Sequence, residues 1–281
     1  MKRVVAIWLL LLCCLPFASC QKKAEEVVEI TPATVDILSI GKGDCIIIRT
    51  GSKTVMIDAG EKDDFYRIRT FLASIGCEHI DTLILTHPDK DHIGGAKSVI
   101  SEYGVKTVIE SHIASDTAEY AAYHALLSEL GKEAMAPTEN YSFTYDSCRF
   151  EVDVPKKTKY KDKEDNNSSL IVSMKCGENN LLFCGDAVEM RLAEWISAKQ
   201  SSYDFVKLPY HGNYLLNYES FLEVAKPTYA AITCSDKNPP QQETLSLLAQ
   251  KGVAVYQTRY GRIRIQTDGT VVRVLEGKTS K

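Results

Sequence analysis

The sequence predicts an α/β fold in which two β-sheets pack face to face and helices cover their outer faces. Short apolar segments of strand length alternate along the chain with longer segments of helical period. The strand-like segments form two groups, one before and one after about residue 140, and each group is followed by helices. A hydrophobic content of 44% in 281 residues is ordinary for a globular protein with a substantial core.

The period of the apolar residues defines each element in turn. In the first half we expect strands at 34–40, 45–50, 53–59, 80–86 and 105–111, and helices at 65–76, 95–103 and 117–130. Asp63 or Asp64 begins the first helix and Gly76 ends it. In the second half we expect strands at 141–146, 148–154, 169–176, 180–186, 205–211, 228–234, 253–258 and 262–276, and helices at 188–197, 218–225 and 242–252. No repeat or linker interrupts 33–276, which we interpret as one domain.

The N-terminus has the composition of an export signal. Lys2 and Arg3 precede the apolar run VVAIWLLLLCCLPF, and small residues then lead to Cys20. The stretch FASC resembles a bacterial lipobox, which implies a lipoprotein signal peptide at 1–19, a lipid on Cys20 and a polar tether at 20–32. A plain secretory signal and an uncleaved anchor are the alternatives. In each case we expect an extracytoplasmic protein, and the lipid would anchor it to the cell membrane.

Six cysteines remain after the signal and Cys20: Cys45, Cys77, Cys148, Cys176, Cys184 and Cys234. An exported protein can form disulfides. The spacings are irregular, no CxxC occurs, and several of the six lie in apolar runs such as NLLFCGD. Buried cysteines in such runs are usually small core residues, so we expect mostly free thiols.

Charge gives one local signal. The net charge of −4 provides no overall basic excess that would require a nucleic-acid partner. The segment PKKTKYKDKEDNN contains five lysines between Lys156 and Lys163. It is either a solvated loop or a patch that steers a polyanion towards a nearby site.

The stretch THPDKDHIGG carries the chemistry. His87, Asp89, Asp91 and His92 place four possible metal ligands in six residues, directly after an apolar strand. Imidazole nitrogens and carboxylate oxygens bind divalent metals, and one tight loop presents them almost preorganised. The glycines that follow at 94 and 95 permit close backbone approach. This pattern indicates a metal site.

With this loop, the chain resembles the metallo-β-lactamase superfamily, whose signature is His-x-His-x-Asp-His, and the resemblance implies its four-layer αββα sandwich. Asp58 in VMIDAG looks like the early aspartate that orients metal ligands from behind. Asp186 in LLFCGDA resembles the aspartate that bridges two metals, and His211 in VKLPYHG resembles the last histidine ligand. The stretch from Asp36 to Gly60 is similar to the nuclease-like domain of the competence protein ComEC and its stand-alone relatives.

Two departures from the superfamily pattern bear on the metal. Asp89 stands where the second histidine is usual, and NNSSL stands where many members have a middle histidine; both are similar to the ComEC branch. The resemblance implies one or two divalent ions, the first held by His87, Asp89 and Asp186 and the second by Asp91, His92, Asp186 and His211. The oxygen-rich ligand set favours manganese slightly over zinc and leaves magnesium possible.

The expected activity is hydrolysis by a metal-bound hydroxide, because a divalent ion lowers the pKa of bound water from ~15.7 to about 7. Asp91 and Asp186 are the catalytic candidates, and the ComEC resemblance implies a polyanionic phosphodiester substrate such as DNA. Asn167, Ser168 and Lys207 are candidate substrate contacts. No GxGxxG or P-loop occurs, so we expect no nucleotide cofactor.

Two alternatives to the phosphodiesterase stay open. The same site hydrolyses a lactone, thioester or β-lactam, or the chain is a non-catalytic surface lipoprotein that binds DNA or another envelope component. The sequence does not determine the oligomeric state.

Overall fold

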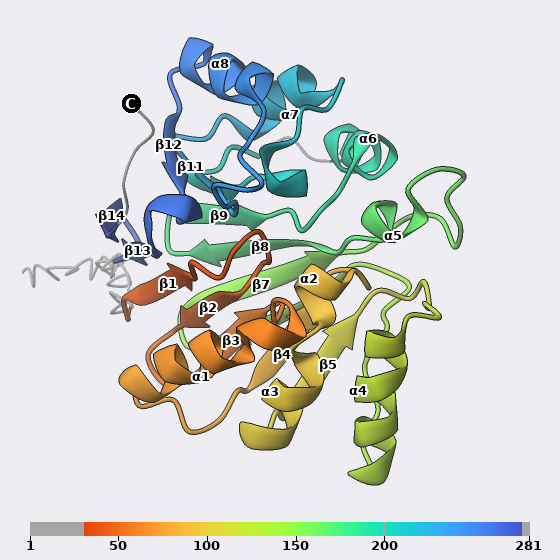
Figure 1. Cartoon of the computed structure of the whole chain (residues 1–281). Helices are drawn as coiled ribbons and strands as arrows, with labels where there is room; N and C mark the ends of the chain where they lie inside the picture. Colours follow the sequence, from red (N-terminus) through yellow and green to blue (C-terminus); the bar gives the residue numbers. More distant parts are fainter. Residues whose placement is uncertain (1–30, 199–200, 277–281) are drawn as a thin grey trace, which may run out of the picture.

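Two seven-stranded sheets form the centre of the computed structural model, which describes residues 31–198 and 201–276. The predicted signal peptide and Cys20 lie outside the described residues. The first sheet has the order β14-β13-β1-β2-β3-β4-β5 and the second has the order β12-β11-β10-β9-β8-β7-β6. Figure 1 shows the two sheets between helices on both outer sides, which confirms the predicted four-layer αββα sandwich. The first sheet comprises β1 (Ala33–Ile37), β2 (Ile46–Arg49), β3 (Thr54–Ile57), β4 (Thr82–Leu85), β5 (Thr107–Glu110), β13 (Ile263–Thr267) and β14 (Val272–Glu276). The second comprises β6 (Tyr141–Tyr145), β7 (Cys148–Asp153), β8 (Ile171–Cys176), β9 (Asn179–Phe183), β10 (Phe205–Lys207), β11 (Tyr229–Ile232) and β12 (Ala254–Gln257).

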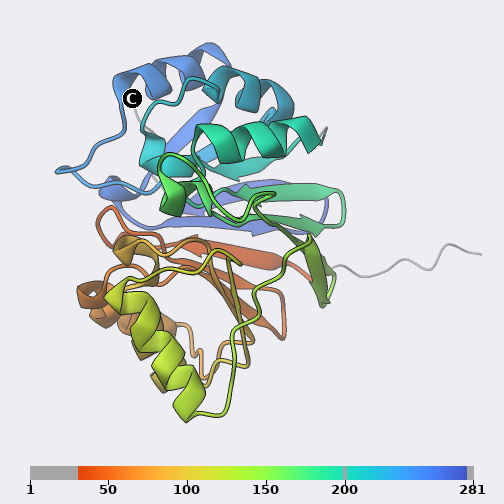
Figure 2. The same ribbon diagram turned by 90° about the vertical axis from the view of Figure 1, so that its right-hand side faces the viewer.

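Three apolar layers hold the sandwich together. The layer between the sheets takes side chains from both, among them Ile48, Phe150, Phe183 and Ile263. A second layer lies under the helices of the first sheet, and a third lies under those of the second sheet. Seen from the side in Figure 2, the helices stand above and below the paired sheets. The first sheet is covered by α1 (Phe65–Ser74), α2 (Lys90–Ile93), α3 (Ala96–Glu102) and α4 (Ala118–Glu129), and the second by α6 (Glu189–Ala198), α7 (Tyr218–Ala225) and α8 (Gln242–Gln250).

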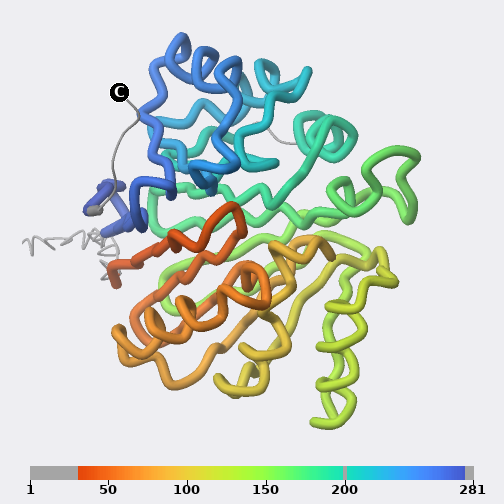
Figure 3. Tube along the Cα trace, viewed as in Figure 1, coloured from red at the N-terminus to blue at the C-terminus, as the bar shows by residue number. Residues whose placement is uncertain are grey.

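The final strands return to the first sheet. β13 pairs antiparallel with β1, with Val35 opposite Ile265, so segments more than 200 residues apart lie side by side. Figure 3 shows this meeting of the red and blue ends of the trace. The first sheet therefore contains strands from both halves of the sequence, because the hairpin of β13 and β14 belongs to it.

Two short helices and one shortened strand differ from the predicted elements. α2 begins inside the ligand loop, residues 87–92, and α5 (Glu164–Asn167) lies at the end of the lysine segment, residues 155–167, where we predicted no helix. The strand predicted at 205–211 ends at Lys207, because Tyr210 and His211 have φ angles of 51° and 53°, which no strand residue adopts. Within the described residues, no helix has the length and apolar character needed to cross a membrane.

Cys148 and Cys176 form a disulfide between β7 and β8, where they are directly opposite in the antiparallel register. The other four thiols, Cys45, Cys77, Cys184 and Cys234, are free as predicted. The spacing of 28 residues gives no sign of this pair. It depends on the strand register, which the sequence pattern does not fix.

Candidate metal centre

The ligand loop begins where β4 ends. Thr86 follows the strand, and its N–H and hydroxyl both donate to the Asp58 carboxylate at 2.7 Å. Asp58 itself follows β3 and has a left-handed φ of 58°, a conformation that turns its side chain towards the parallel neighbour β4. The ring Nδ1 of His92 lies 2.7 Å from the same carboxylate. Asp58 thus ties the start of the loop to one of its histidines from behind.

Asp186 and His211 come from the second sheet. Asp186 follows β9 and comes directly after Gly185, which has a φ of 52°. A Cβ at Gly185 would lie 2.9 Å from the Thr86 hydroxyl oxygen, which leaves no room for a side chain there. His211 lies in a short 3-10 turn after β10, and its Nδ1 is 3.0 Å from the Thr233 hydroxyl. The close approach at Gly185 brings the two sheets' loops together at one end of the sandwich.

Side chains from these loops converge on a small volume. Asp186 lies between two imidazoles, with Oδ1 3.3 Å from His92 Nε2 and Oδ2 3.0 Å from His211 Nε2. His211 Nε2 is also 3.3 Å from Asp91 Oδ2, and the rings of His87 and His92 are 4.0 Å apart. The atoms of His87, His92 and Asp186 are spaced so that they could hold one ion. His92 therefore joins His87 here, whereas the resemblance assigned the two histidines to different ions.

The buried polar atoms of the cluster fit a metal. Four of them, on residues at most 4% exposed, have no hydrogen-bond partner: Nε2 of His87, His92 and His211, and Oδ1 of Asp186. Oδ2 of Asp91 is also buried and contacts the Lys42 ammonium at 3.0 Å. Leaving such atoms buried and unpaired is costly, so native proteins seldom do it without an ion or water. Each histidine also has its Nδ1 beside a hydroxyl or carboxylate, which is how metal-bound imidazoles are usually held.

The charges keep the carboxylates ionised. Burial raises the pKa of the Asp186 carboxyl, but His211 and His92 outweigh burial and hold that pKa well below its usual range. Burial acts in the same direction on Asp91, and His211, His92 and Lys42 lower the pKa of that carboxyl. An ionised carboxylate in a buried site is the form that binds a cation.

Asp44 and Lys207 form a buried ion pair behind the histidines. Asp44, which the sequence analysis missed, lies 3.7 Å from His211 Nδ1 and 4.0 Å from His92 Nδ1. Its spacing to these two histidines would suit a second ion. The Lys207 ammonium, however, already contacts the Asp44 carboxylate and donates to the Gly185 carbonyl at 3.2 Å. We therefore interpret Asp44 as a residue that supports the two histidines. The GKGD sequence around Asp44 does not predict this role.

The three predicted substrate contacts are enclosed by protein groups. Lys207 has no exposed surface, so its ammonium does not reach solvent. Asn167 bonds the Asp162 carbonyl and the Arg191 N–H, and the Ser168 hydroxyl donates to the Asp165 carbonyl at 2.6 Å. These bonds hold the lysine segment in place. Asn166, the residue before Asn167, contacts a predicted ligand instead, with its Nδ2 3.3 Å from Asp89 Oδ2.

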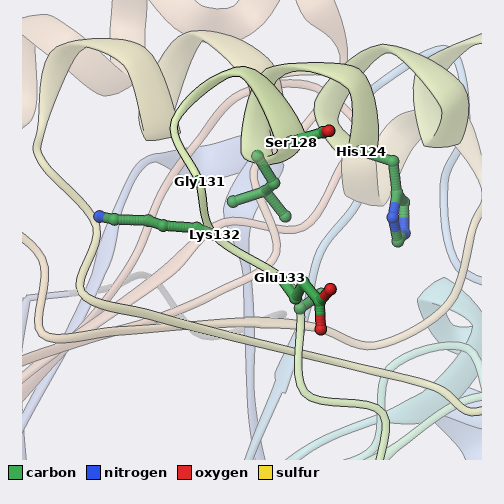
Figure 4. A pocket seen from close by; sticks show the side chains of 7 residues that line it. His124, Ser128, Gly131, Lys132 and Glu133 are labelled. Atoms are coloured by element: carbon green, nitrogen blue, oxygen red, sulfur yellow. The ribbon is translucent and has the colours of Figure 1, made fainter.

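Asp89 is the most open of the predicted ligands. Its side chain is 36% exposed, and its Oδ2 is 3.4 Å from His87 Nε2. The remaining three histidines, His79, His112 and His124, contact groups outside the cluster. A cavity of about 760 Å³ lies beside His124, between the C-terminal half of α4 and the turn that follows, and Figure 4 shows Lys132 and Glu133 on its wall. None of the predicted ligands lines this cavity.

Comparisons with known proteins agree with this geometry. A family profile described as "Metallo-beta-lactamase superfamily" matches residues 39–235. ComE operon protein 3 of Bacillus subtilis (strain 168) is 27% identical over 247 residues, which cover 80% of this chain and 31% of that protein. Recombination protein 2 of Haemophilus influenzae is 23% identical over 241 residues, which cover 82% of this chain and 28% of that protein. Both relatives confirm the predicted resemblance to the ComEC group, and the chain spans less than a third of their length.

Among solved structures, CmlA, a diiron beta-hydroxylase from Streptomyces venezuelae, has a TM-score of 0.54 and 13% identity. The match covers 84% of this chain and 54% of that one. It shows the shared fold.

Proposed function

The chain belongs to the metallo-beta-lactamase superfamily, and we propose that it is a metal-dependent phosphodiesterase that acts outside the cytoplasm. The superfamily match and the two relatives support the broader class of metal-dependent hydrolase. The observation that carries the proposal is the set of four buried ligand atoms without a hydrogen-bond partner, on His87, His92, Asp186 and His211. A divalent ion, when bound, supplies a Lewis acid and lowers the pKa of its water.

The chain's own residues provide the rest of the reaction. His87, His92 and Asp186 would hold an ion, His211 lies beside them with its Nε2 3.0 Å from Asp186, and Asp58 fixes His92 through its Nδ1. Asp91 Oδ2 is buried and lies between His211 Nε2, at 3.3 Å, and the ammonium of the half-exposed Lys42, at 3.0 Å. It is the carboxylate oxygen that would take a proton from an attacking water. No serine or cysteine nucleophile is needed for this chemistry.

The lysine segment supports a phosphodiester over a neutral substrate. All five lysines between Lys156 and Lys163 are exposed, and the segment is anchored by the buried Tyr160, whose hydroxyl bonds Glu194. Lys163 lies over the ring of Tyr210, the residue before the ligand His211, at 4.7 Å from the ring centroid. A fixed cationic segment beside the site would attract a polyanion such as DNA.

The proposed localisation outside the cytoplasm rests on the sequence of the N-terminal residues alone. The export signal at 1–19 and the lipobox-like Cys20 support a lipid anchor on the outer face of a bacterial membrane. Incorporation of a radiolabelled fatty acid into the wild-type chain and not into Cys20→Ser would establish that anchor. A Cys20→Ser chain that is still labelled would reject it.

Hydrolysis of bis(p-nitrophenyl) phosphate and of DNA by the metal-loaded protein tests the activity. We expect turnover with Mn²⁺ or Zn²⁺ that falls on the order of 10³-fold in Asp186→Asn and in His211→Ala. His79→Ala is the matched control, because it removes a histidine outside the cluster, and we expect it to keep wild-type turnover. Stoichiometric metal without turnover would shift the function to a lactone, thioester or other ester, and no metal uptake would favour the non-catalytic binding protein.

A further inference from the structure

The turn from Gly41 to Asp44 is built onto the ligand loop. The Asp44 N–H donates to the Asp91 carbonyl at 3.0 Å, and the Gly60 N–H donates to the Asp44 carbonyl at 2.8 Å. A Cβ at Gly43 would lie 2.8 Å from that Asp91 carbonyl oxygen, and Gly41 has a φ of 95°. Glycine is the residue that tolerates this approach and this φ angle, so the turn fixes the backbone from which Lys42 reaches Asp91 and Asp44 reaches Lys207.

Two lysine ammoniums lie next to the predicted ligands, and their surroundings differ. Lys207 is fully buried and is bonded to Asp44 and to the Gly185 carbonyl. Lys42 has a side chain that is 40% exposed, and its Nζ is 3.0 Å from Asp91 Oδ2, with Asp89 and Asp186 close enough to act on its charge. The Lys207 ammonium is enclosed by protein and does not reach solvent, whereas the Lys42 ammonium has three N–H donors and a side chain that is open to solvent.

We propose that Lys42 binds an anionic oxygen of the substrate at the solvent side of the metal centre. This inference rests on the proposed phosphodiesterase function and names a residue that would select an anionic substrate. An ammonium beside Asp91 repels a divalent cation and attracts a phosphate oxygen. Removing it should therefore affect the two ligands in opposite directions. A residue that only maintained the turn would affect both in the same direction.

The test measures both ligands on the full chain. Calorimetry first gives the affinity for Mn²⁺ and then the affinity of the Mn²⁺-loaded protein for inorganic phosphate. In Lys42→Met we expect Mn²⁺ affinity equal to or tighter than wild type and phosphate affinity about ten-fold weaker, since one charge-assisted hydrogen bond is lost. Lys42→Arg should restore most of the phosphate affinity.

Lys90→Met is the matched control, because it removes the same charge from an exposed residue of the same ligand loop. We expect a change of less than about three-fold in phosphate affinity, the size of an unspecific surface-charge effect. In turnover of bis(p-nitrophenyl) phosphate, Lys42→Met should raise KM more than it lowers kcat.

The outcomes separate this inference from the proposed function. Equal phosphate affinity in wild type and Lys42→Met, or equal losses of Mn²⁺ and phosphate affinity, would overturn the inference while leaving the phosphodiesterase intact. Lys42-dependent phosphate binding without hydrolysis of any diester would support the inference and reject the reaction. A wild-type chain that takes up no metal would overturn both.

Discussion

The layer between the two sheets and the metal-facing cluster at one end of the sandwich are equally buried and chemically opposite. Between the sheets, side chains such as Phe150 and Ile263 are wholly apolar and have no exposed surface. At the end, Asp44, Asp58 and Asp186 are at most 2% exposed, and the neighbouring histidines have Nε2 atoms without a hydrogen-bond partner. Burial stabilises the first region and disfavours the second, because unpaired polar groups lose their hydration. Burial of the apolar layer therefore has to supply the folding free energy that offsets burial of the polar cluster.

A large-to-small substitution in the apolar layer between the sheets should give the largest loss of stability. Phe150 is fully buried and stacks on Phe143 at 4.9 Å between ring centroids. We expect Phe150→Ala to lower the free energy of unfolding by about 3–5 kcal/mol, through lost burial and the cavity left behind. Denaturant unfolding measures the loss, and the folded fraction should keep wild-type Mn²⁺ affinity. A large loss of affinity would mean that the two regions are not separable.

The disulfide belongs to the same stabilising region. Cys148 and Cys176 enclose a separation of 28 residues and lie in the layer between the sheets. Replacing both by alanine should lower the free energy of unfolding by about 3 kcal/mol, since the unfolded chain gains freedom. Unfolding of the wild type with and without reductant should give the same difference. An unchanged midpoint in reductant would argue against the pairing.

A substitution in the metal-facing cluster should have the opposite effect, lowering the affinity for metal rather than the free energy of unfolding. Asp58 accepts bonds from the Thr86 N–H and hydroxyl and contacts His92. We expect Asp58→Asn to weaken Mn²⁺ binding about 10- to 100-fold, because the amide no longer fixes the His92 ring. Calorimetry checks this. Affinity within a factor of two of wild type would show that His92 is held by other contacts.

Asp81 is the matched control, because it also accepts three bonds but lies away from the cluster. Its partners are the Thr54 N–H and the ammoniums of Lys53 and Lys106. We expect Asp81→Asn to leave metal affinity unchanged and to cost about 1 kcal/mol of stability at pH 7. Metal affinity that falls as far as in Asp58→Asn would remove the distinction between the two aspartates.

The cost of Asp81→Asn should also depend on pH. Burial raises the pKa of the Asp81 carboxyl, but Lys106, the Thr54 N–H and Lys53 together lower it below its ordinary value of 3.8. A lowered pKa in the folded state gives stability that is complete above pH 4 and is lost as the carboxylate protonates. The difference between wild type and variant should therefore shrink below about pH 4. A difference that grows in acid would contradict the sign.

Most of the fold follows from local pattern, because strand and helix periods are written in consecutive residues. The pattern located α1 and α3 to within a residue or two, and it located Thr117, whose hydroxyl caps α4. It could not show that β13 pairs with β1, or that Cys148 faces Cys176, because both depend on registers between distant segments.

The site divides in the same way. The loop from His87 to His92 is predictable from the sequence, because its possible ligands lie close together in the chain. The family resemblance added Asp58, Asp186 and His211. Asp44, Thr233 and Lys42 were missed, since each gains its role only when two loops meet in space. Lys207 looked like a substrate contact because its burial and its pairing with Asp44 are not visible in the sequence.

Metal uptake by the purified chain tests the central claim most directly. Wild type and Asp186→Ala are dialysed against Mn²⁺ and Zn²⁺ and the bound metal is counted per chain, with His79→Ala as control. The buried atoms without a hydrogen-bond partner on His87, His92, Asp186 and His211 predict one or two ions in wild type and in the control, and loss of uptake in Asp186→Ala. Wild-type protein without metal, or full uptake by Asp186→Ala, would contradict the assignment of this cluster as a metal centre.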